Sequence, residues 1–349
     1  MFEKNDYPFV SIILPIRNEK LYIKDCLNAV LKQTYPEDRI EVIVVDGLSD
    51  DGTLEILEAL KIKNEKIKIL RNDKKIVSSA LNKGIRNSKG DIIVRIDGHT
   101  IIRNDFILKN IELLNNHDEA WIVGGPIIHK GRNSFSKALA MTMSSYFGVG
   151  NANHRKSDYE GYAEGAVFPA IRKFVFSKVG YFDEHFVRNQ DDEFNYRVLL
   201  NGGKIFISPS VSHSYFVRDS ASKLFKQYFQ YGFWKLEIIK KHKRTISIRH
   251  LIPLFFFLYL IGLILILLLQ VERLNTFIFF LTPLIAYLIL IIIHVSIIMK
   301  RTKKIFIAIL SGFCAIVMHI SYGIGTFAGI FSKIILNSKL NKLVTELSR

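Results

Sequence analysis

Cysteine is scarce in this sequence, and Cys26 and Cys314 are the only two thiols among 349 residues. They lie in different regions and have neither the spacing of a metal-binding motif nor that of a disulfide framework. Their scarcity agrees with a reducing compartment, where disulfides seldom persist. The two cysteines therefore give no indication of a function.

No cleavable signal peptide is recognisable at the start of the sequence. Glu3, Lys4, Asp6 and Pro8 interrupt any apolar run before the strand that we expect at residues 9–14. We therefore expect the N-terminal domain to stay on the cytoplasmic side of a membrane.

The glycine-rich fingerprint of dinucleotide-binding proteins is absent as well. No G-x-G-x-x-G follows the expected strand 9–14, where residues 15–19 read PIRNE instead. The glycine-rich runs at 148–150 and 323–329 lie in the wrong context, the second of them inside an apolar segment. This absence excludes a dinucleotide-dependent dehydrogenase.

Long apolar runs are confined to the C-terminal part of the chain. Residues 251–269, 277–299 and 305–331 each form a run about as long as the ~20 residues that cross a hydrocarbon core. The sequence therefore predicts a soluble domain followed by a transmembrane region of three spans at 250–335 and a tail at 336–349.

The net charge of +16 reflects few acidic side chains, and its placement excludes a nucleic-acid partner. Basic residues cluster beside the apolar runs, which follows the positive-inside rule and would attract anionic headgroups. We expect a membrane enzyme that contacts lipids. The rule places residues 240–249 and 300–304 in the cytoplasm, so that 270–275 joins the first two spans outside. A third span would place the tail outside, although its lysines favour the inside. The clustered residues are Lys235, Lys240, Lys241, Lys243, Arg244 and Arg249 before the first span, and Lys300, Arg301, Lys303 and Lys304 before the third.

Apolar strands alternate with amphipathic helical patterns over the first hundred residues. Strands are expected at 9–14, 40–45 and 67–70 and in the run that begins at Asp91, with helical spacing between them. Such alternation predicts a mainly parallel, doubly wound α/β sheet.

Acidic residues follow three of these strands. Glu19, Asp46 and Asp97 each come at or just after a strand end, where open α/β sheets bind their ligands. Asp97-Gly98-His99 combines a carboxylate and an imidazole, which suits a divalent ion that also holds phosphate oxygens. The alternative is an Asp-Gly turn followed by a solvated histidine. A crevice lined in this way would suit a nucleobase, a ribose and a metal ion.

The second half of the soluble domain carries an acidic cluster at residues 191–193. Crowded carboxylates raise the proton affinity of at least one of them, as a general base requires. The alternative is an acidic helix N-terminus stabilised by the helix dipole. Upstream, the Gly-Gly-Pro interruption in a strand at 120–128 predicts the close approach of a ligand, and residues 148–161 are expected to form a mobile flap.

An amphipathic helix is expected between this domain and the first span. Apolar and aromatic side chains recur at helical spacing among lysines, which is typical of a helix on a membrane surface. They are Leu224, Tyr228, Tyr231, Trp234 and Ile238.

Four blocks in a fixed order resemble glycosyltransferase family 2. They read VSIILPIRNE, VIVVDGLSDDGT, SALNKGI and IIVRIDGHT, and the resemblance extends over residues 9–235. The sequence is similar in particular to membrane-anchored members that build succinoglycan and related exopolysaccharides. The resemblance implies a GT-A fold, a nucleotide-sugar donor (usually a UDP-sugar), a bound Mn²⁺ or Mg²⁺ and inversion at the anomeric carbon.

The resemblance also assigns roles to residues of the donor side. Pro15 and Glu19 would border the nucleoside, and Asp46 would accept a hydrogen bond from the uracil. Asp97 would be the first metal-associated carboxylate. His99 stands where the family usually has a second aspartate, and an imidazole there favours Mn²⁺ over Mg²⁺.

On the acceptor side, Asp191 aligns with the family's general base, and Gln190 replaces the usual glutamate before it. Beyond the strand at 205–207, His213 could complete the metal shell or Arg218 could hold the diphosphate. Residues 227–232 lack the Arg and Trp of the Q-x-x-R-W motif that processive members carry. We therefore expect a single-addition enzyme.

The sequence predicts an α/β protein with a GT-A nucleotide-sugar-binding domain, in which a Rossmann-like mixed, mainly parallel sheet precedes a C-terminal transmembrane helical region. The expected boundaries are 1–235 for the catalytic domain, with a donor half at 9–103 and an acceptor half at 104–219, and 220–249 for the interfacial helix. The expected activity is metal-dependent, inverting sugar transfer to a polyprenyl-linked saccharide or a growing polysaccharide at the cytoplasmic face of the plasma membrane. A polyprenyl-phosphate glycosyltransferase and a non-catalytic nucleotide-sugar-binding membrane module remain the alternatives.

Overall fold

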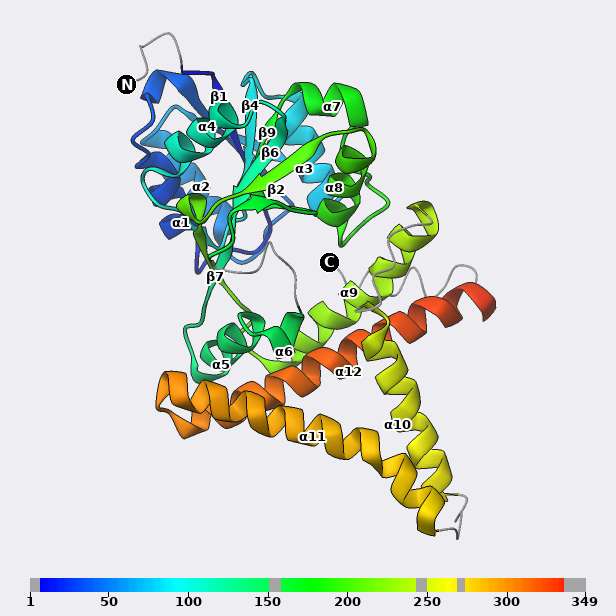
Figure 1. Cartoon of the computed structure of the whole chain (residues 1–349). Coiled ribbons are helices and arrows are strands. Elements are labelled where there is room, and N and C mark those ends of the chain that lie inside the picture. Colours follow the sequence, from blue (N-terminus) through cyan, green and yellow to red (C-terminus); the bar gives the residue numbers. More distant parts are fainter. Residues whose placement is uncertain (1–6, 151–157, 243–249, 269–273, 336–349) are drawn as a thin grey trace. The chain divides into compact units, whose positions relative to one another are not determined.

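The computed structural model describes residues 7–150, 158–242, 250–268 and 274–335 (Figure 1). The chain forms two compact units. An α/β unit contains residues 1–128 and 152–215, and a helical unit contains 129–151 and 216–348. The expected acceptor half at 104–219 is therefore divided, because residues 129–151 pack with the C-terminal helices.

The α/β unit is built on an eight-stranded mixed sheet of order β3-β2-β1-β4-β9-β6-β10-β8. The four N-terminal strands are parallel, and β9 runs antiparallel between β4 and β6. β1 and β4 are buried along their whole length, because apolar side chains point to both faces of a covered parallel sheet. The strands are β1 (Val10–Ile16), β2 (Ile40–Asp46), β3 (Ile67–Arg71), β4 (Ile92–Arg95), β6 (Ala120–Gly125), β8 (Gly161–Tyr162), β9 (Val167–Arg172) and β10 (Lys204–Ile207).

Helices cover both faces of this sheet. One core joins the sheet to α1 (Ile23–Leu31), α2 (Thr53–Ile62) and α4 (Phe106–Asn116). The other joins it to α3 (Val77–Arg86), α7 (Phe174–Val179) and α8 (Gln190–Leu200). Short 3-10 turns lie at η1 (Glu37–Arg39) and η3 (Pro209–Val211), and β5 (Thr100–Ile101) pairs with β11 (His213–Phe216) beyond the sheet edge. This doubly wound arrangement agrees with the fold that the sequence predicts.

The Gly-Gly-Pro interruption after β6 lies where the chain packs closely on itself. A Cβ atom at Gly125 would lie 2.4 Å from the Val211 carbonyl oxygen, and one at Gly124 would lie 2.8 Å from Ala166 Cβ. Glycine is therefore required here because the chain packs closely on itself, and the approach of a ligand stays a prediction.

The helical unit begins where β7 (Ile127–Lys130) leads into α5 (Ser134–Met143) and α6 (Tyr146–Val149). Its remaining helices are α9 (Ala221–His242), α10 (Ile252–Leu268), α11 (Leu274–Thr302) and α12 (Ile305–Ile335). By length and composition, Phe280–Thr302 in α11 and Ile305–Phe331 in α12 could cross a membrane, and Ile252–Leu268 is a shorter apolar helix. Among the described residues, two of the three expected spans therefore have the length to cross, and the count of three stays a prediction.

The side of α9 that carries Phe229 and Gly232 packs against α12, and the membrane-surface role of its expected apolar face stays a prediction. A Cβ atom at Gly232 would lie 2.2 Å from the Tyr322 carbonyl oxygen, and one at Gly325 would lie 2.0 Å from the Phe229 carbonyl oxygen. Residues 151–157 of the expected flap, 243–249, most of the expected outer loop and the tail lie outside the described residues.

Candidate active site

The loops that follow β1 and β2 are joined by a set of hydrogen bonds. The Asn18 amide group donates to Asp50 Oδ1 (2.9 Å), and its carbonyl oxygen accepts from the Asp50 backbone N–H (3.0 Å). The Ser49 hydroxyl accepts from the Asn18 backbone N–H (2.9 Å). Asn18 adopts a left-handed φ of 57°, which asparagine tolerates better than most residues. The two strand-end loops therefore form one continuous rim.

Asp46 lies at the base of this rim and is 4% exposed. Its carboxylate accepts hydrogen bonds from the Ser49 hydroxyl (2.5 Å) and the Ser49 backbone N–H (3.1 Å). Pro15 is buried inside β1, where it is paired with Val45, one residue before Asp46. Both residues lie at the sheet edge that the sequence predicts for the nucleoside.

Glu19 and His99 form a close pair across the edge of the sheet. Glu19 Oε1 lies 2.7 Å from His99 Nδ1, and the His99 ring packs edge-on against Tyr215 at 4.7 Å between centroids. A Cβ atom at Gly98 would lie 2.9 Å from Glu19 Cγ, so glycine is needed for this contact. His99 Nε2 is buried and has no hydrogen-bond partner within the described part of the chain. A carboxylate behind one ring nitrogen and a vacant lone pair on the other is the arrangement of many metal-binding histidines.

Arg95, which the sequence reasoning did not single out, holds Asp97. Its Nε and Nη2 donate to Asp97 Oδ1 (3.0 Å) and Oδ2 (3.2 Å), and the guanidinium lies over the Phe168 ring at 5.8 Å. The side chain is 9% exposed, and although burial opposes its charge, Asp97 and Asp191 raise the pKa of Arg95 above its ordinary value. The sequence feature that points to Arg95 is a charged residue inside the buried apolar run IIVRI.

The three acids of α8 have three different environments. Burial and the neighbouring Asp192 charge raise the pKa of Asp191, and Arg95 lowers it in part. Asp192 is exposed. Glu193 is fully buried and accepts from Arg197 through both oxygens (2.8–3.0 Å), while that guanidinium also donates to backbone carbonyls before α8. Glu193 therefore anchors the helix, and Asp191 is the acid whose charge interacts with that of Arg95.

His213 begins β11 and lies on the Asp97 side of the same region. It is 2% exposed, with its ring 4.7 Å from the Phe168 ring. Burial lowers the pKa of His213 to about 4, and the Val211 backbone and the Asp97 charge oppose this shift only in part. Neither ring nitrogen makes a hydrogen bond of ordinary length and angle with another described residue. His213 is thus a neutral imidazole with lone-pair capacity near Asp97.

The donor set around Asp97 fits a divalent ion. No group of three His, Cys, Asp or Glu side chains is already gathered at metal-binding distances within the described residues. Two histidines nevertheless bring unsatisfied buried nitrogens to this region, His99 through Nε2 and His213 through both ring atoms. One carboxylate with neutral imidazoles is a set that Mn²⁺ accepts.

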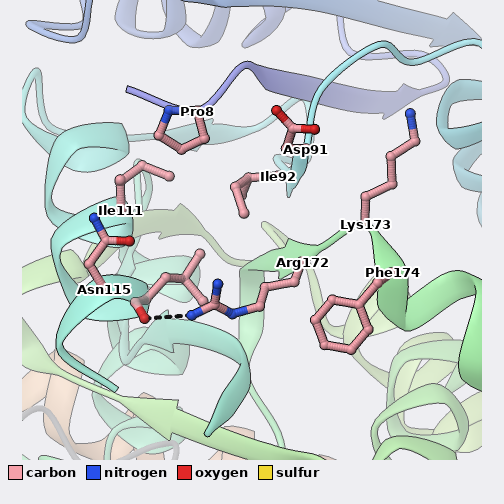
Figure 2. A pocket seen from close by; sticks show the side chains of 9 residues that line it. Pro8, Asp91, Ile92, Ile111, Asn115, Arg172, Lys173 and Phe174 are labelled. Atoms are coloured by element: carbon pink, nitrogen blue, oxygen red, sulfur yellow. Dashed lines mark hydrogen bonds between the residues drawn. The ribbon is translucent and has the colours of Figure 1, made fainter. Parts of the chain in front are cut away.

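A separate hollow of about 550 Å³ lies at the opposite end of the parallel strands, where β4 begins and β9 ends (Figure 2). Its cations are engaged by the backbone, since Arg172 donates to the Leu114 (2.7 Å) and Ala120 (3.1 Å) carbonyls and Lys173 donates to that of Ser88 (2.9 Å). Because open α/β sheets bind ligands beyond the carboxyl ends of parallel strands, this hollow is not the donor site. Its lining residues are Pro8, Asp91, Ile92, Ile111, Leu114, Asn115, Arg172, Lys173 and Phe174.

Comparisons with known proteins agree with this geometry. The sequence model of "Glycosyl transferase family 2" matches residues 11–180. The chain is 33% identical over 240 residues, 67% of its length and 74% of the relative, to the dolichyl N-acetyl-alpha-D-glucosaminyl phosphate 3-beta-D-2,3-diacetamido-2,3-dideoxy-beta-D-glucuronosyltransferase of Methanococcus voltae. It is 30% identical over 246 residues, 70% of its length and 74% of the relative, to the succinoglycan biosynthesis protein ExoA of Rhizobium meliloti (strain 1021).

A solved structure has the same fold. The mannosyltransferase PcManGT from Pyrobaculum calidifontis, in complex with GDP-Man and Mn²⁺, superposes with a TM-score of 0.59 at 15% identity, over 93% of this chain and 88% of that one. The sequence blocks, the relatives and the doubly wound sheet therefore lead to one conclusion: the chain belongs to glycosyltransferase family 2 and is a glycosyltransferase with a GT-A domain.

Proposed function

We propose that this chain moves a sugar from a nucleotide-sugar donor, a UDP-sugar, to a hydroxyl group of a lipid-linked saccharide, with inversion and at the cytoplasmic membrane face. The observation that carries this proposal is the placement of Asp191. It is the half-buried acid of α8 whose charge interacts with Arg95, the partner of Asp97. A carboxylate with a raised pKa at the edge of a donor site suits a general base.

The reaction assigned to Asp191 is one proton transfer coupled to one displacement. Asp191 takes the proton of the acceptor hydroxyl while that oxygen bonds to the anomeric carbon. The bond between the anomeric carbon and the phosphate oxygen breaks on the opposite face, and its electron pair leaves with the nucleoside diphosphate. Attack opposite the leaving group inverts the anomeric centre.

The donor residues keep the roles that the family resemblance implies, with one change. The Asp46 carboxylate has four lone-pair sites and uses two for Ser49, so it can accept one more N–H from a base. Pro15 lies on the neighbouring strand, paired with Val45 beside Asp46, where it would border the nucleoside. We assign Glu19 chiefly to orienting the His99 ring, because its carboxylate lies 2.7 Å from Nδ1.

Asp97, His99 and His213 are the residues that we propose to hold a Mn²⁺ or Mg²⁺ ion. When bound, the ion would supply positive charge against the diphosphate as it departs. Imidazole nitrogens favour Mn²⁺ over the oxygen-preferring Mg²⁺. Arg95 orients the Asp97 carboxylate through the ion pair between them.

The acceptor class rests on the relatives and on the apolar helices. The Methanococcus voltae relative is named for a dolichyl phosphate-linked sugar. The two long apolar helices indicate membrane association, which would bring a lipid-linked acceptor within reach. A polyprenyl phosphate as the acceptor itself is disfavoured, because a phosphate oxygen is already ionised and needs no base such as Asp191.

The test compares two adjacent aspartates in the full-length chain in detergent. We expect Asp191→Asn to lower turnover by a factor on the order of 10² to 10⁴ while donor affinity stays within a few-fold, because only the base is lost. Asp192→Asn is the matched control, since its side chain is exposed, and it should retain most of the turnover. Donor affinity is measured by calorimetry and turnover by release of the nucleoside diphosphate.

Three results would contradict the proposal. Full activity of Asp191→Asn would rule out Asp191 as the general base and would favour a polyprenyl-phosphate acceptor. A large loss in Asp192→Asn alone would move the base by one residue. A wild-type protein that binds donor but releases no nucleoside diphosphate with native membrane lipids would be a binding module, not an enzyme.

A further inference from the structure

The helix α12 is contacted along most of its length by helices that carry exposed charges. Thr142 in α5 donates to the Ser311 carbonyl (3.0 Å), and His319 Nε2 lies 3.0 Å from the Phe147 carbonyl of α6. Further along, Gly329 packs against α9. The axial distance from Ser311 to Gly329 is about 27 Å at 1.5 Å per residue, nearly the thickness of a hydrocarbon core. Figure 1 shows α5, α6 and α9 along this helix.

These neighbouring helices do not belong in hydrocarbon. α9 carries exposed Lys223, Lys226, Lys240 and Lys241, and α5 carries exposed Lys137. A lysine at the bilayer centre costs about 2.5–3.5 kcal/mol or more. From Ser311 to Gly329, one side of α12 is therefore covered by helices that we expect to lie outside the hydrocarbon core.

Away from α5 and α9, the exposed residues of α12 are apolar and lie near its two ends, while α10 and α11 contact the helix between them. Ile305, Ile309 and Phe313 recur every four residues with exposed fractions of 65%, 60% and 46%, and Phe331 near the end is 43% exposed. By contrast the covered side is made of small and polar residues such as Ser311 and Ala315, which are fully buried. This two-sided pattern is typical of a helix that lies in the plane of a membrane interface.

The helices next to α12 restrict its orientation further. α10 meets α12 near its start, since a Cβ atom at Gly323 would lie 2.3 Å from the Pro253 carbonyl. α11 ends only a few residues before Ile305. If α10 and α11 cross as a hairpin, the start of α10 and the end of α11 lie on one side of the membrane. Ile305 and Gly323 must then lie on that same side, although about 27 Å of helix separates them.

A polar contact in the middle of α12 supports the same orientation. His319 Nδ1 lies 3.0 Å from the Tyr287 hydroxyl of α11. In a spanning α12, His319 would sit near the bilayer midplane, where polar side chains are costly. In a helix that lies flat, it stays at the level of the headgroups.

From these contacts we propose that α12 does not span the membrane but lies in its interface, with its Ile305–Phe331 apolar side on the lipid and its small-residue side under α5 and α9. The chain then crosses twice, through α10 and α11. Both ends of the chain lie on the catalytic side, which also places the basic tail where the positive-inside rule prefers it.

The test measures the depth of single spin labels in the full-length protein, reconstituted in phosphatidylcholine and phosphatidylglycerol vesicles, with Cys26 and Cys314 replaced by alanine. Labels at Phe306→Cys, Phe313→Cys and Phe331→Cys report on α12 through their relative accessibility to oxygen and to a water-soluble nickel complex. We expect the three to have the same depth within a few ångströms. Labels at Ile297→Cys, Ile292→Cys and Ile285→Cys on α11, all exposed positions, are the control and should differ in depth by about 10 Å or more, given 1.5 Å per residue.

A depth profile in which Phe313 lies much deeper than Phe306 and Phe331 would overturn the proposal, because it is the profile of a span. A reporter after Arg349 gives an independent readout. Activity on the same side as an N-terminal reporter supports two crossings, and activity on the opposite side refutes them.

Discussion

Arg95 is the residue on which the charges of the site converge. It pairs with Asp97 through two hydrogen bonds and lies within electrostatic reach of Asp191. Its guanidinium therefore affects both the proposed metal carboxylate and the proposed base. Because Asp192 acts on Asp191 in the opposite direction, two substitutions should shift the same titration with opposite signs.

The first residue-scale prediction concerns the acid limb of the pH profile of kcat/KM. The base works when Asp191 is ionised, so activity falls as the pH drops through its raised pKa. Asp192→Asn removes a like charge and should move the limb to lower pH. Arg95→Met removes an opposite charge and should move it to higher pH.

Arg103→Met is the matched control for this prediction. Arg103 and Asp105 form the same Arg-x-Asp pair, with two hydrogen bonds of 3.0 and 2.8 Å, on an exposed turn. Arg103→Met should leave the acid limb of the kcat/KM profile unchanged. If the acid limbs of Asp192→Asn and Arg95→Met moved in the same direction, or did not move, Asp191 would not be the group that sets the pH profile.

The Glu19–His99 pair leads to a prediction about metal activation. Glu19→Gln keeps the size of the side chain but removes the charge that orients the imidazole. The Mn²⁺ concentration for half-maximal activity should rise by about 10- to 100-fold, as for other residues that orient a metal ligand, and the same loss should appear in calorimetric Mn²⁺ binding. Glu37→Gln removes the exposed ion pair with Lys66 and is the control. An unchanged Mn²⁺ requirement in Glu19→Gln would argue that His99 does not hold the ion.

At the scale of elements, small residues decide how the helices of the C-terminal unit meet. Gly232 of α9 and Gly325 of α12 let the two backbones approach until each faces a carbonyl of the other helix. Such close approach is the usual role of small residues between helices in membrane proteins. The side of α9 that carries Phe229 and Gly232 thus packs on α12.

Gly325→Ala should separate α9 from α12, because its methyl group would lie 2.0 Å from the Phe229 carbonyl. We expect a loss of about 1–3 kcal/mol in stability, the usual cost of overpacking, seen as a lower Tm in detergent. Gly262→Ala in α10 is the control, since nothing lies within 4 Å of the added Cβ atom, and alanine favours a helix. Equal Tm values for the two variants would contradict this packing.

At the scale of the whole molecule, a charged α/β unit and an apolar helical unit share one chain. Only 11% of the apolar stretch of α11 is buried within the protein, against 39% of that of α12. An exposed apolar surface of this kind is typical of a site that contacts a membrane or another protein. Membrane attachment is therefore expected to be hydrophobic and not electrostatic.

Extraction of membranes with alkaline carbonate tests this expectation. The chain should stay in the membrane pellet after carbonate and after high salt, because screening of the basic clusters leaves the apolar contacts intact. Release by carbonate would mean that neither α10 nor α11 crosses the bilayer. A known peripheral protein released from the same membranes serves as the control.

Local sequence patterns determined the elements and the order of the α/β unit. Apolar runs bounded by glycine, as in Ile92 to Ile96, predict buried strands because each side chain of a covered parallel strand meets a helix layer. The strand-end positions of Asp46 and Asp97 follow from the same runs, and the four family blocks carried the fold and the enzyme class. These features were predictable because they depend on neighbouring residues and on periods of 2 or 3.6.

Only the tertiary structure decided which side chains pair. Asp191 and Glu193 belong to the same run of three acids, and the sequence does not distinguish them. In the structure, Glu193 accepts a hydrogen bond from Arg197, while the charge of Asp191 interacts with that of Arg95. Glu19 meets His99 across 80 positions of chain, and α9 meets α12 across the intervening helices α10 and α11. Such contacts depend on loop paths and on close backbone packing, and no local period encodes them. For that reason the sequence alone determined where the acids stand, and the folded chain determined which of them are available for chemistry.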